Sequence, residues 1–163
     1  MIIIADSSPL ISLAIIHKLH LLKDIFQEII VPNSVFEEII KSERKYSSQL
    51  DEWSKPFVKK CNNIEAFNAY RISLGKGESE AIVLSKENRN SILLLDDKKA
   101  RKVAKYENLK VIGTIGILIS AKEKGLISEI NSSLKLLEEN DIHLSKSLIR
   151  KALEMTGEGS DSA

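Results

Sequence analysis

Cysteine is almost absent from this sequence. Cys61 is the only one among the 163 residues, which excludes an intrachain disulfide and a zinc site built from cysteines. The three histidines, His17, His20 and His143, are scattered, and no third ligand stands near the first two, so we expect surface side chains rather than a zinc site. An excess of one charge is also absent, since the net charge is +1. The overall charge therefore neither indicates nor excludes a nucleic-acid partner.

A long hydrophobic run is missing too. The apolar segment 2–5 is interrupted by Asp6 and has no basic residues before it, so we expect neither a signal peptide nor a membrane span. We therefore expect a cytoplasmic protein. The length allows one domain with a real hydrophobic core. We predict a single domain over 1–156, which includes C-terminal helices over 128–156. The small, polar residues 157–163 should form a disordered tail.

Short apolar runs alternate with helical patterns along the chain. The predicted strands are 2–5, 28–31, 57–60, 91–95 and 110–112. The predicted helices are one that begins at Pro9 after a Ser7 or Ser8 cap, one capped by Asn33 or Ser34, and 19–26, 78–88, 97–106, 114–124, 129–139 and 145–155. The polar stretch 42–56 is either a flexible flap or a short surface helix. This alternation predicts an α/β fold with a parallel sheet covered by helices on both faces.

Carboxylates follow two of the predicted strands. Asp6 comes directly after 2–5, and with Ser7 or Ser8 as the helix cap it has no structural duty. Asp96 and Asp97 follow 91–95, and one of them is expected to cap the next helix. Ligands of open α/β sheets bind at the carboxyl ends of the strands. Carboxylates gathered there repel each other unless a cation lies between them, and hard oxygen ligands suit Mg²⁺ or Mn²⁺.

Two further pairs of acids lie in predicted helices. Glu37 and Glu38 are equally far from the centre of the apolar face of their helix, so periodicity does not separate them. Glu78 and Glu80 stand in the first turn of theirs, where the helix dipole favours acids. In that second helix the apolar residues 81–84 cover every side. We therefore expect it to be interior, with at least one of its two acids directed into a polar cavity.

A basic face is predicted on the helix over 97–106. Lys98, Arg101, Lys102 and Lys105 share it by their spacing of three and four residues. Such a face is usually solvated. Because it follows Asp96 and Asp97 directly, it would also draw a phosphate backbone past the carboxylates.

Four segments together give the chain a resemblance to a known family. In chain order they are Asp6-Ser7-Ser8-Pro9-Leu10-Ile11-Ser12-Leu13, residues 31–39 (VPNSVFEEI), 77–82 (GESEAI) and 95–101 (LDDKKAR). A further segment, 111–116 (VIGTIG), fits with these four. With these motifs the chain resembles PIN-domain proteins, the nuclease fold of the VapC-type toxins. The resemblance covers about residues 1–125.

The resemblance implies a three-layer α/β/α sandwich around a parallel sheet, with an acidic Mg²⁺ or Mn²⁺ site that cleaves RNA. Asp6 matches the first acid of the family, Glu38 the helix acid and Asp96 the late strand-end acid. The third acid, often Asp in the family, is Glu78 or Glu80 here. The resemblance and the residue patterns together predict Asp6, Glu38, Glu80 and Asp96 for catalysis; Asp6, Asp96, Glu78, Glu80 and Asp97 for the metal; and Ser8, Arg101, Lys98 and Lys102 for the substrate.

The function that follows is a metal-dependent endoribonuclease, and the toxin of a toxin–antitoxin pair is one form that it could take. The alternative is a non-catalytic protein of the same fold that binds RNA or a partner, which the replacement of Asp by Glu favours. An antitoxin-like protein or a second copy of the chain could use the apolar stripe on the last helix, although packing on the chain's own core is the simpler explanation. Its residues are Leu148, Ile149, Ala152 and Leu153. No membrane partner is expected.

Overall fold

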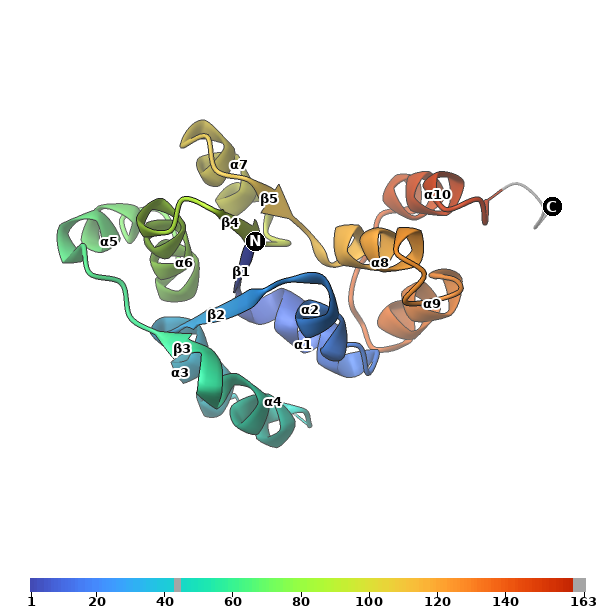
Figure 1. The fold of residues 1–163 in the computed structure, drawn as a ribbon, viewed down its shortest axis with the longest axis horizontal. Coiled ribbons are helices and arrows are strands. Elements are labelled where there is room, and N and C mark those ends of the chain that lie inside the picture. The colour runs from blue at the N-terminus through green and yellow to red at the C-terminus, as the bar shows by residue number, and fades with distance from the viewer. Residues whose placement is uncertain (43–44, 160–163) are drawn as a thin grey trace.

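A parallel sheet of five strands forms the centre of the computed structural model, which describes residues 1–42 and 45–159. Its strand order is β3-β2-β1-β4-β5 (Figure 1). The strands are β1 (Ile2–Ala5), β2 (Glu28–Pro32), β3 (Val58–Lys59), β4 (Ser91–Leu94) and β5 (Val111–Ile112). Each lies within or close to a segment that the sequence predicts as a strand. Every neighbouring pair is parallel, which confirms the predicted architecture.

Both faces of the sheet are covered. In β1, Ile3 and Ala5 belong to one hydrophobic cluster, whereas Ile4 belongs to a second one, and all three side chains are fully buried. Successive side chains of a strand point to opposite faces. A strand buried on both sides therefore needs an uninterrupted apolar run, which the sequence supplies at 2–5.

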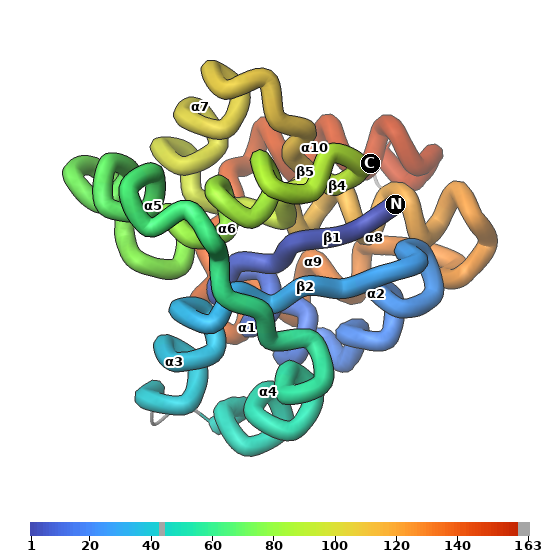
Figure 2. Tube along the Cα trace, turned by 60° about the vertical axis from the view of Figure 1, so that its left-hand side comes forward, coloured from blue at the N-terminus to red at the C-terminus, as the bar shows by residue number. Residues whose placement is uncertain are grey.

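Ten helices of the described residues surround the sheet. They are α1 (Ser7–Ile15), α2 (His20–Ile25), α3 (Asn33–Lys41), α4 (Ser47–Ser54), α5 (Ile64–Tyr70), α6 (Lys76–Glu87), α7 (Lys98–Tyr106), α8 (Thr114–Glu123), α9 (Asn131–Glu139) and α10 (Lys146–Met155). Residues of α6 and α7 pack in the cluster of Ile4, and residues of α1, α3 and α8 in the cluster of Ile3. The chain is thus a three-layer α/β/α sandwich, and Figure 2 shows β1 and β2 running between its helical layers.

Most helix boundaries lie within two residues of the prediction, and two helices need comment. The first begins at Ser7 rather than at Pro9, because a proline in the first turn gives up only an N–H that has no partner within the helix. Helix α5 was not predicted. None of its residues is fully buried, but Ala66, Phe67 and Tyr70 form a partly buried apolar side that packs against the cluster of Ile4.

The segment 42–56 contains α4, whose Leu50 is buried and whose Trp53 packs against Phe57 with ring centroids 5.1 Å apart. Residues 43 and 44 of this segment lie outside the described residues. The polar stretch therefore includes a helix that contributes to the core.

The C-terminal segment makes an ordered contact as far as Glu158. Its carboxylate accepts hydrogen bonds from the backbone N–H groups of Ile130 and Asn131 and pairs with Lys122 Nζ at 2.9 Å. These contacts lie inside the range predicted as a disordered tail, 157–163, because an acid at the start of α9 meets unpaired N–H groups. Residues 160–163 lie outside the described residues. Among the helices of 1–42 and 45–159, none is long and apolar enough to cross a membrane.

Candidate functional site

The strand order brings two acid-bearing loops together. β1 lies between β2 and β4, and Ala5 pairs with Leu94 at the carboxyl ends of β1 and β4. The connections leave β1 and β4 toward opposite edges of the sheet, so the loops after these strands flank the topological switch point. Asp6 stands in one loop, and Asp96 and Asp97 stand in the other. The acids that the sequence predicts at this edge of the sheet therefore stand in two neighbouring loops.

Asp6 is a buried acid with an unusual ionisation. Its side chain is 4% exposed, and although the residue is the N-cap of α1, the side chain makes no capping hydrogen bond. Burial raises the pKa of Asp6 to about 7, and repulsion from Glu78, Glu38 and Asp97 adds to this, while the Ser7 backbone N–H opposes it. We call Asp6, Glu38, Glu78 and Asp97 the acidic cluster. The charges of Glu38, Glu78 and Asp97 all act on Asp6.

Glu38 is held at the N-terminal end of α6. Its Oε1 accepts a hydrogen bond of 2.9 Å from the Gly77 N–H, and its Oε2 accepts one of 3.0 Å from Ser7 Oγ. A Cβ at Gly77 would lie 2.8 Å from Glu38 Oε1 and 3.2 Å from Asp6 Oδ1. The missing side chain therefore lets both carboxylates approach the same point, where the unpaired N–H groups of the helix favour anions.

Glu37 faces a different environment. Its Oε1 accepts a hydrogen bond from Asn33 Nδ2 within α3. The structure thus separates the two acids that periodicity leaves equivalent, and it brings Glu38 to the cluster.

Glu78 is affected by the charge of Asp97. Burial, and then repulsion from Asp97 and Glu38, raises the pKa of Glu78, while Lys99 opposes the shift. Asp97 is the N-cap of α7, and its Oδ2 accepts a hydrogen bond of 2.8 Å from the Ala100 N–H. Asp97 therefore caps a helix and also contributes charge to the cluster.

Glu80 is occupied by two backbone groups. It is 5% exposed, its Oε1 accepts a hydrogen bond of 2.7 Å from the Ser34 N–H, and its Oε2 accepts one of 3.0 Å from the Cys61 N–H. These bonds tie α6 to the start of α3 and to the loop after β3. Of the two candidates for the third acid, the structure brings Glu78 to the cluster and engages both oxygens of Glu80 elsewhere.

Asp96 is bound to the start of α8. Its Oδ1 and Oδ2 accept hydrogen bonds from Thr114 N–H (2.8 Å) and Thr114 Oγ1 (2.5 Å). Arg101 Nη1 donates to Leu95 O at 2.8 Å. A Cβ at Gly113 would lie 2.9 Å from Asp96 Oδ1 and 3.0 Å from Arg101 Nη1. Asp96 and Arg101 are thus packed together beside the cluster.

The remaining predicted substrate residues are at the surface. Ser8, Lys98 and Lys102 are exposed. Ser8 follows Ser7 in the first turn of α1, and the two lysines lie on α7. Their positions leave them accessible to a ligand.

Sequence reasoning missed several contributors to this site. Ser7, Gly77, Thr114 and Lys99 each act on one of the acids through a contact described above. Gly77 had a usable signal, because a glycine followed by acids at a helix start indicates close approach of an anion to the backbone. The other three depend on which elements meet in space.

The cluster fits a hard divalent cation by its chemistry. All four members supply carboxylate oxygens, which Mg²⁺ and Mn²⁺ prefer. Burial, and then repulsion within the cluster, raises the pKa of Asp6, and a cation among these groups would relieve the repulsion. Within the described part of the chain, no three His, Cys, Asp or Glu side chains are already gathered closely enough to hold one ion. Some of these carboxylates would therefore have to turn toward one another on binding.

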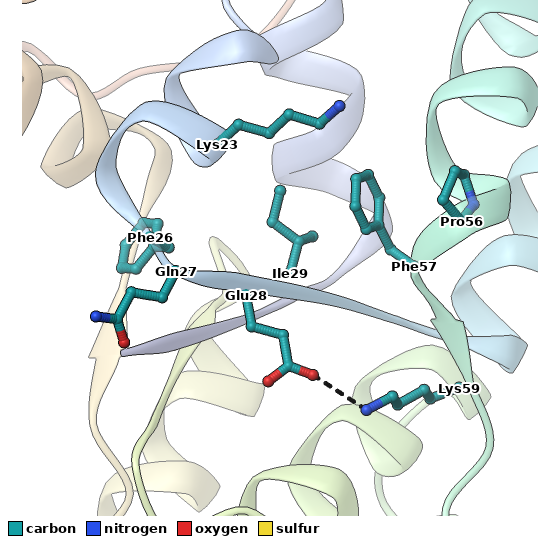
Figure 3. A pocket seen from close by; sticks show the side chains of 8 residues that line it. All are labelled: Lys23, Phe26, Gln27, Glu28, Ile29, Pro56, Phe57 and Lys59. Atoms are coloured by element: carbon teal, nitrogen blue, oxygen red, sulfur yellow. Dashed lines mark hydrogen bonds and ion pairs between the residues drawn. The ribbon is translucent and has the colours of Figure 1, made fainter.

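One pocket lies away from the acidic cluster and is not part of the candidate site. It has a volume of about 390 Å³ and lies between α2, the start of β2 and the segment that leads into β3 (Figure 3). Lys59 is paired there with Glu28 at 3.1 Å, and Lys23 Nζ lies 5.3 Å from the centre of the Phe57 ring. Glu28 begins β2, so this pocket is at the end of that strand opposite to the acidic cluster.

One comparison with known proteins identifies the family of the chain. A protein-family model described as PIN domain matches residues 2–158. No match was found among curated proteins or among solved structures.

Proposed function

Because the chain belongs to the PIN-domain family, whose members are generally nucleases, we propose that it is a metal-dependent endoribonuclease. The reaction would be hydrolysis of RNA phosphodiester bonds. The observation that carries the proposal is the buried Asp6, which stands at a strand end among three more carboxylates and has a pKa raised to about 7. Such strongly shifted acids in a crevice are typical of reaction sites.

We assign metal binding to the acidic cluster. Asp6, Glu78 and Asp97 would be the ligands, and Glu38 would join them or hold a second ion. When bound, Mg²⁺ or Mn²⁺ would lower the pKa of a water molecule and stabilise negative charge on the phosphate. Asp6 must be ionised for this role, so metal binding and loss of its proton are coupled.

The other residues would position these ligands. Gly77 and Ser7 hold the carboxylate of Glu38 through its two oxygens. Asp96 binds the start of α8, and Glu80 links α6 to two other segments. In place of the metal-ligating roles that the resemblance implies for Asp96 and Glu80, we propose positioning roles.

The substrate phosphate would approach from the side of α7. Lys99 lies near enough to Glu78 to affect its pKa, and Lys98 and Lys102 are exposed on the same helix. Arg101 stands beside Asp96. These cations would offset the repulsion between the RNA backbone and the carboxylates.

The test is RNA cleavage by the purified chain in Mg²⁺ or Mn²⁺. We expect cleavage by the wild type that stops in EDTA and is lost in Asp6→Asn, Glu78→Gln and Asp97→Asn. Glu37→Gln is the matched control, since this acid neighbours Glu38 but binds Asn33, and it should retain activity. Cleavage that persists in Asp6→Asn, or that needs no divalent metal, would contradict the proposal.

The same protein variants distinguish two further possibilities for the function. Metal-induced thermal stabilisation that depends on Asp6, without cleavage of any RNA tested, would favour a non-catalytic RNA- or partner-binding protein. If the chain is the toxin of a toxin–antitoxin pair, expression of the wild type alone should arrest bacterial growth and expression of Asp6→Asn should not. Equal growth with both proteins would contradict the toxin role.

A further inference from the structure

A groove opens beside the acidic cluster, between β5, the start of α8 and the C-terminal helix α10. Its volume is about 550 Å³, which lies within the range of pockets that hold small ligands. Asp96 and Arg101 form part of its lining, and the residue after Asp96 is Asp97 of the cluster. A ligand in this groove would therefore lie directly next to the candidate reaction site.

The walls of the groove are mainly aliphatic. Ile112 and Ile119 line one side, and Leu144, Leu148 and Met155 come from the C-terminal segment. Leu148 is 44% exposed and Met155 is 59% exposed. Apolar side chains exposed along a groove indicate a surface that a ligand covers, and a planar base can pack between apolar side chains of this kind.

A glycine shapes the floor of the groove. A Cβ at Gly116 would lie only 2.6 Å from Ile112 Cγ1. The absence of this side chain lets Ile112 lie flat against the first turn of α8. Gly116 and Ile112 both line the groove.

The charges of the groove favour an anionic ligand. Arg101 and Lys151 line it, and the exposed Lys98 and Lys102 lie on the same helix as Arg101. Among the described residues, Asp96 is the one acid in the lining, and its two oxygens already accept hydrogen bonds from Thr114. Phosphates of a nucleic acid would meet the cations, while a base would meet the aliphatic walls.

We infer that this groove binds one nucleotide of the RNA strand, with its base between the aliphatic walls and its phosphate near Arg101 and Lys151. It would thereby select which nucleotide stands next to the cleaved bond. Single-stranded RNA suits such a groove because its unstacked bases can be splayed into pockets. The inference rests on the proposed function, and the continuity with the acidic cluster favours RNA over a protein segment as the occupant.

The test measures RNA binding rather than cleavage. A short fluorescent single-stranded RNA is titrated with the full chain carrying Asp6→Asn, in versions with an abasic residue placed at each position in turn. Leu148→Ser and Lys151→Glu are added to this background. Leu126→Ser and Lys146→Glu are the matched controls, because Leu126 is 41% exposed, Lys146 is exposed on α10, and neither lines the groove.

We expect one abasic position to weaken binding about tenfold, as loss of a base contact does. In Leu148→Ser this penalty should fall to about twofold, because the base and the side chain act on each other. Lys151→Glu should weaken binding of intact and abasic RNA by the same factor and reduce its salt dependence. The two controls should behave like the parent. Met155→Ser serves as the second groove variant should Leu148→Ser have a lowered melting temperature.

Three outcomes would overturn the inference. An abasic penalty that stays at full size in both Leu148→Ser and Met155→Ser would place the base elsewhere, although cleavage by the wild type would leave the nuclease proposal intact. Unchanged RNA binding by these variants, together with release of a protein that copurifies with the parent, would assign the groove to a protein partner. Absence of both RNA binding and RNA cleavage would refute the proposed function as well.

Discussion

The ionisation of Asp6 predicts a specific pH dependence of stability. In the unfolded chain this carboxyl group has its ordinary pKa of 3.8, and in the folded chain the pKa is raised to about 7. The folded state therefore holds the proton more tightly. Between these two values the unfolded chain releases its proton first, so the free energy of unfolding falls as pH rises from about 4 to about 7. Above that range Asp6 is ionised in both states, and the loss in free energy of unfolding stays constant.

The size of the effect follows from the same two pKa values. A change in pKa from 3.8 to about 7 lowers the free energy of unfolding by about 4 kcal/mol. This corresponds to about 10 °C in melting temperature for a domain of this size. Asp6→Asn keeps an oxygen that can accept the Ser7 N–H and removes the titration. In EDTA, the variant should therefore gain stability over the wild type as pH rises from 4 to 8.

Thermal and urea unfolding of both proteins across this pH range measures the difference directly. The acids whose pKa is lowered, Glu107, Glu129 and Glu158, contribute stability that is lost as pH falls below their ordinary values, and they do so in both proteins. Saturating Mn²⁺ should restore stability to the wild type above pH 7 and not to the variant. A difference between the two proteins that is the same at pH 5 and pH 8 would refute the reasoning.

Three other substitutions test separate contacts. In Gly77→Ala, the new Cβ would lie 2.8 Å from Glu38 Oε1, so we expect the carboxylate to move and RNA cleavage to slow by about a hundredfold, as measured under single-turnover conditions. Glu80→Gln should cost about 1–3 kcal/mol in urea unfolding because it leaves a buried N–H poorly paired; unchanged stability would contradict this. Glu158→Gln should cost about 1–2 kcal/mol through its pairing with Lys122, and this cost should shrink as pH falls from the ordinary Glu pKa of 4.5 through the lowered pKa of Glu158.

The sheet was predictable from local patterns alone. A strand such as 2–5, which is buried on both faces, requires an uninterrupted apolar run, and few other structures give a run this short before an acid and a helix start. Helix α5 was missed although Ala66, Phe67 and Tyr70 stand at helical spacing and pack partly buried against the core. A second signal is Asn63, whose side chain accepts a hydrogen bond from the Ala66 N–H at the start of the helix.

The acids of the site were predictable as a set, but their individual roles were not. Glu78 and Glu80 lie in the same turn of one helix. What distinguishes them is that Glu80 reaches the N–H groups of Ser34 and Cys61, both far away along the chain. Asp96 likewise differs from Asp97 because it reaches Thr114. Such partners depend on how the elements pack, and local spacing does not contain that information.

The central claim is that Asp6 shares a divalent cation with its neighbours in the acidic cluster. Crystals grown with Mn²⁺ would locate the ion directly through its anomalous scattering. We expect a peak within about 2–2.5 Å of an Asp6 oxygen, with Glu78 or Asp97 as a further ligand. A peak on Asp96 and Glu80 without Asp6, or no peak at a Mn²⁺ concentration that supports RNA cleavage, would contradict the claim.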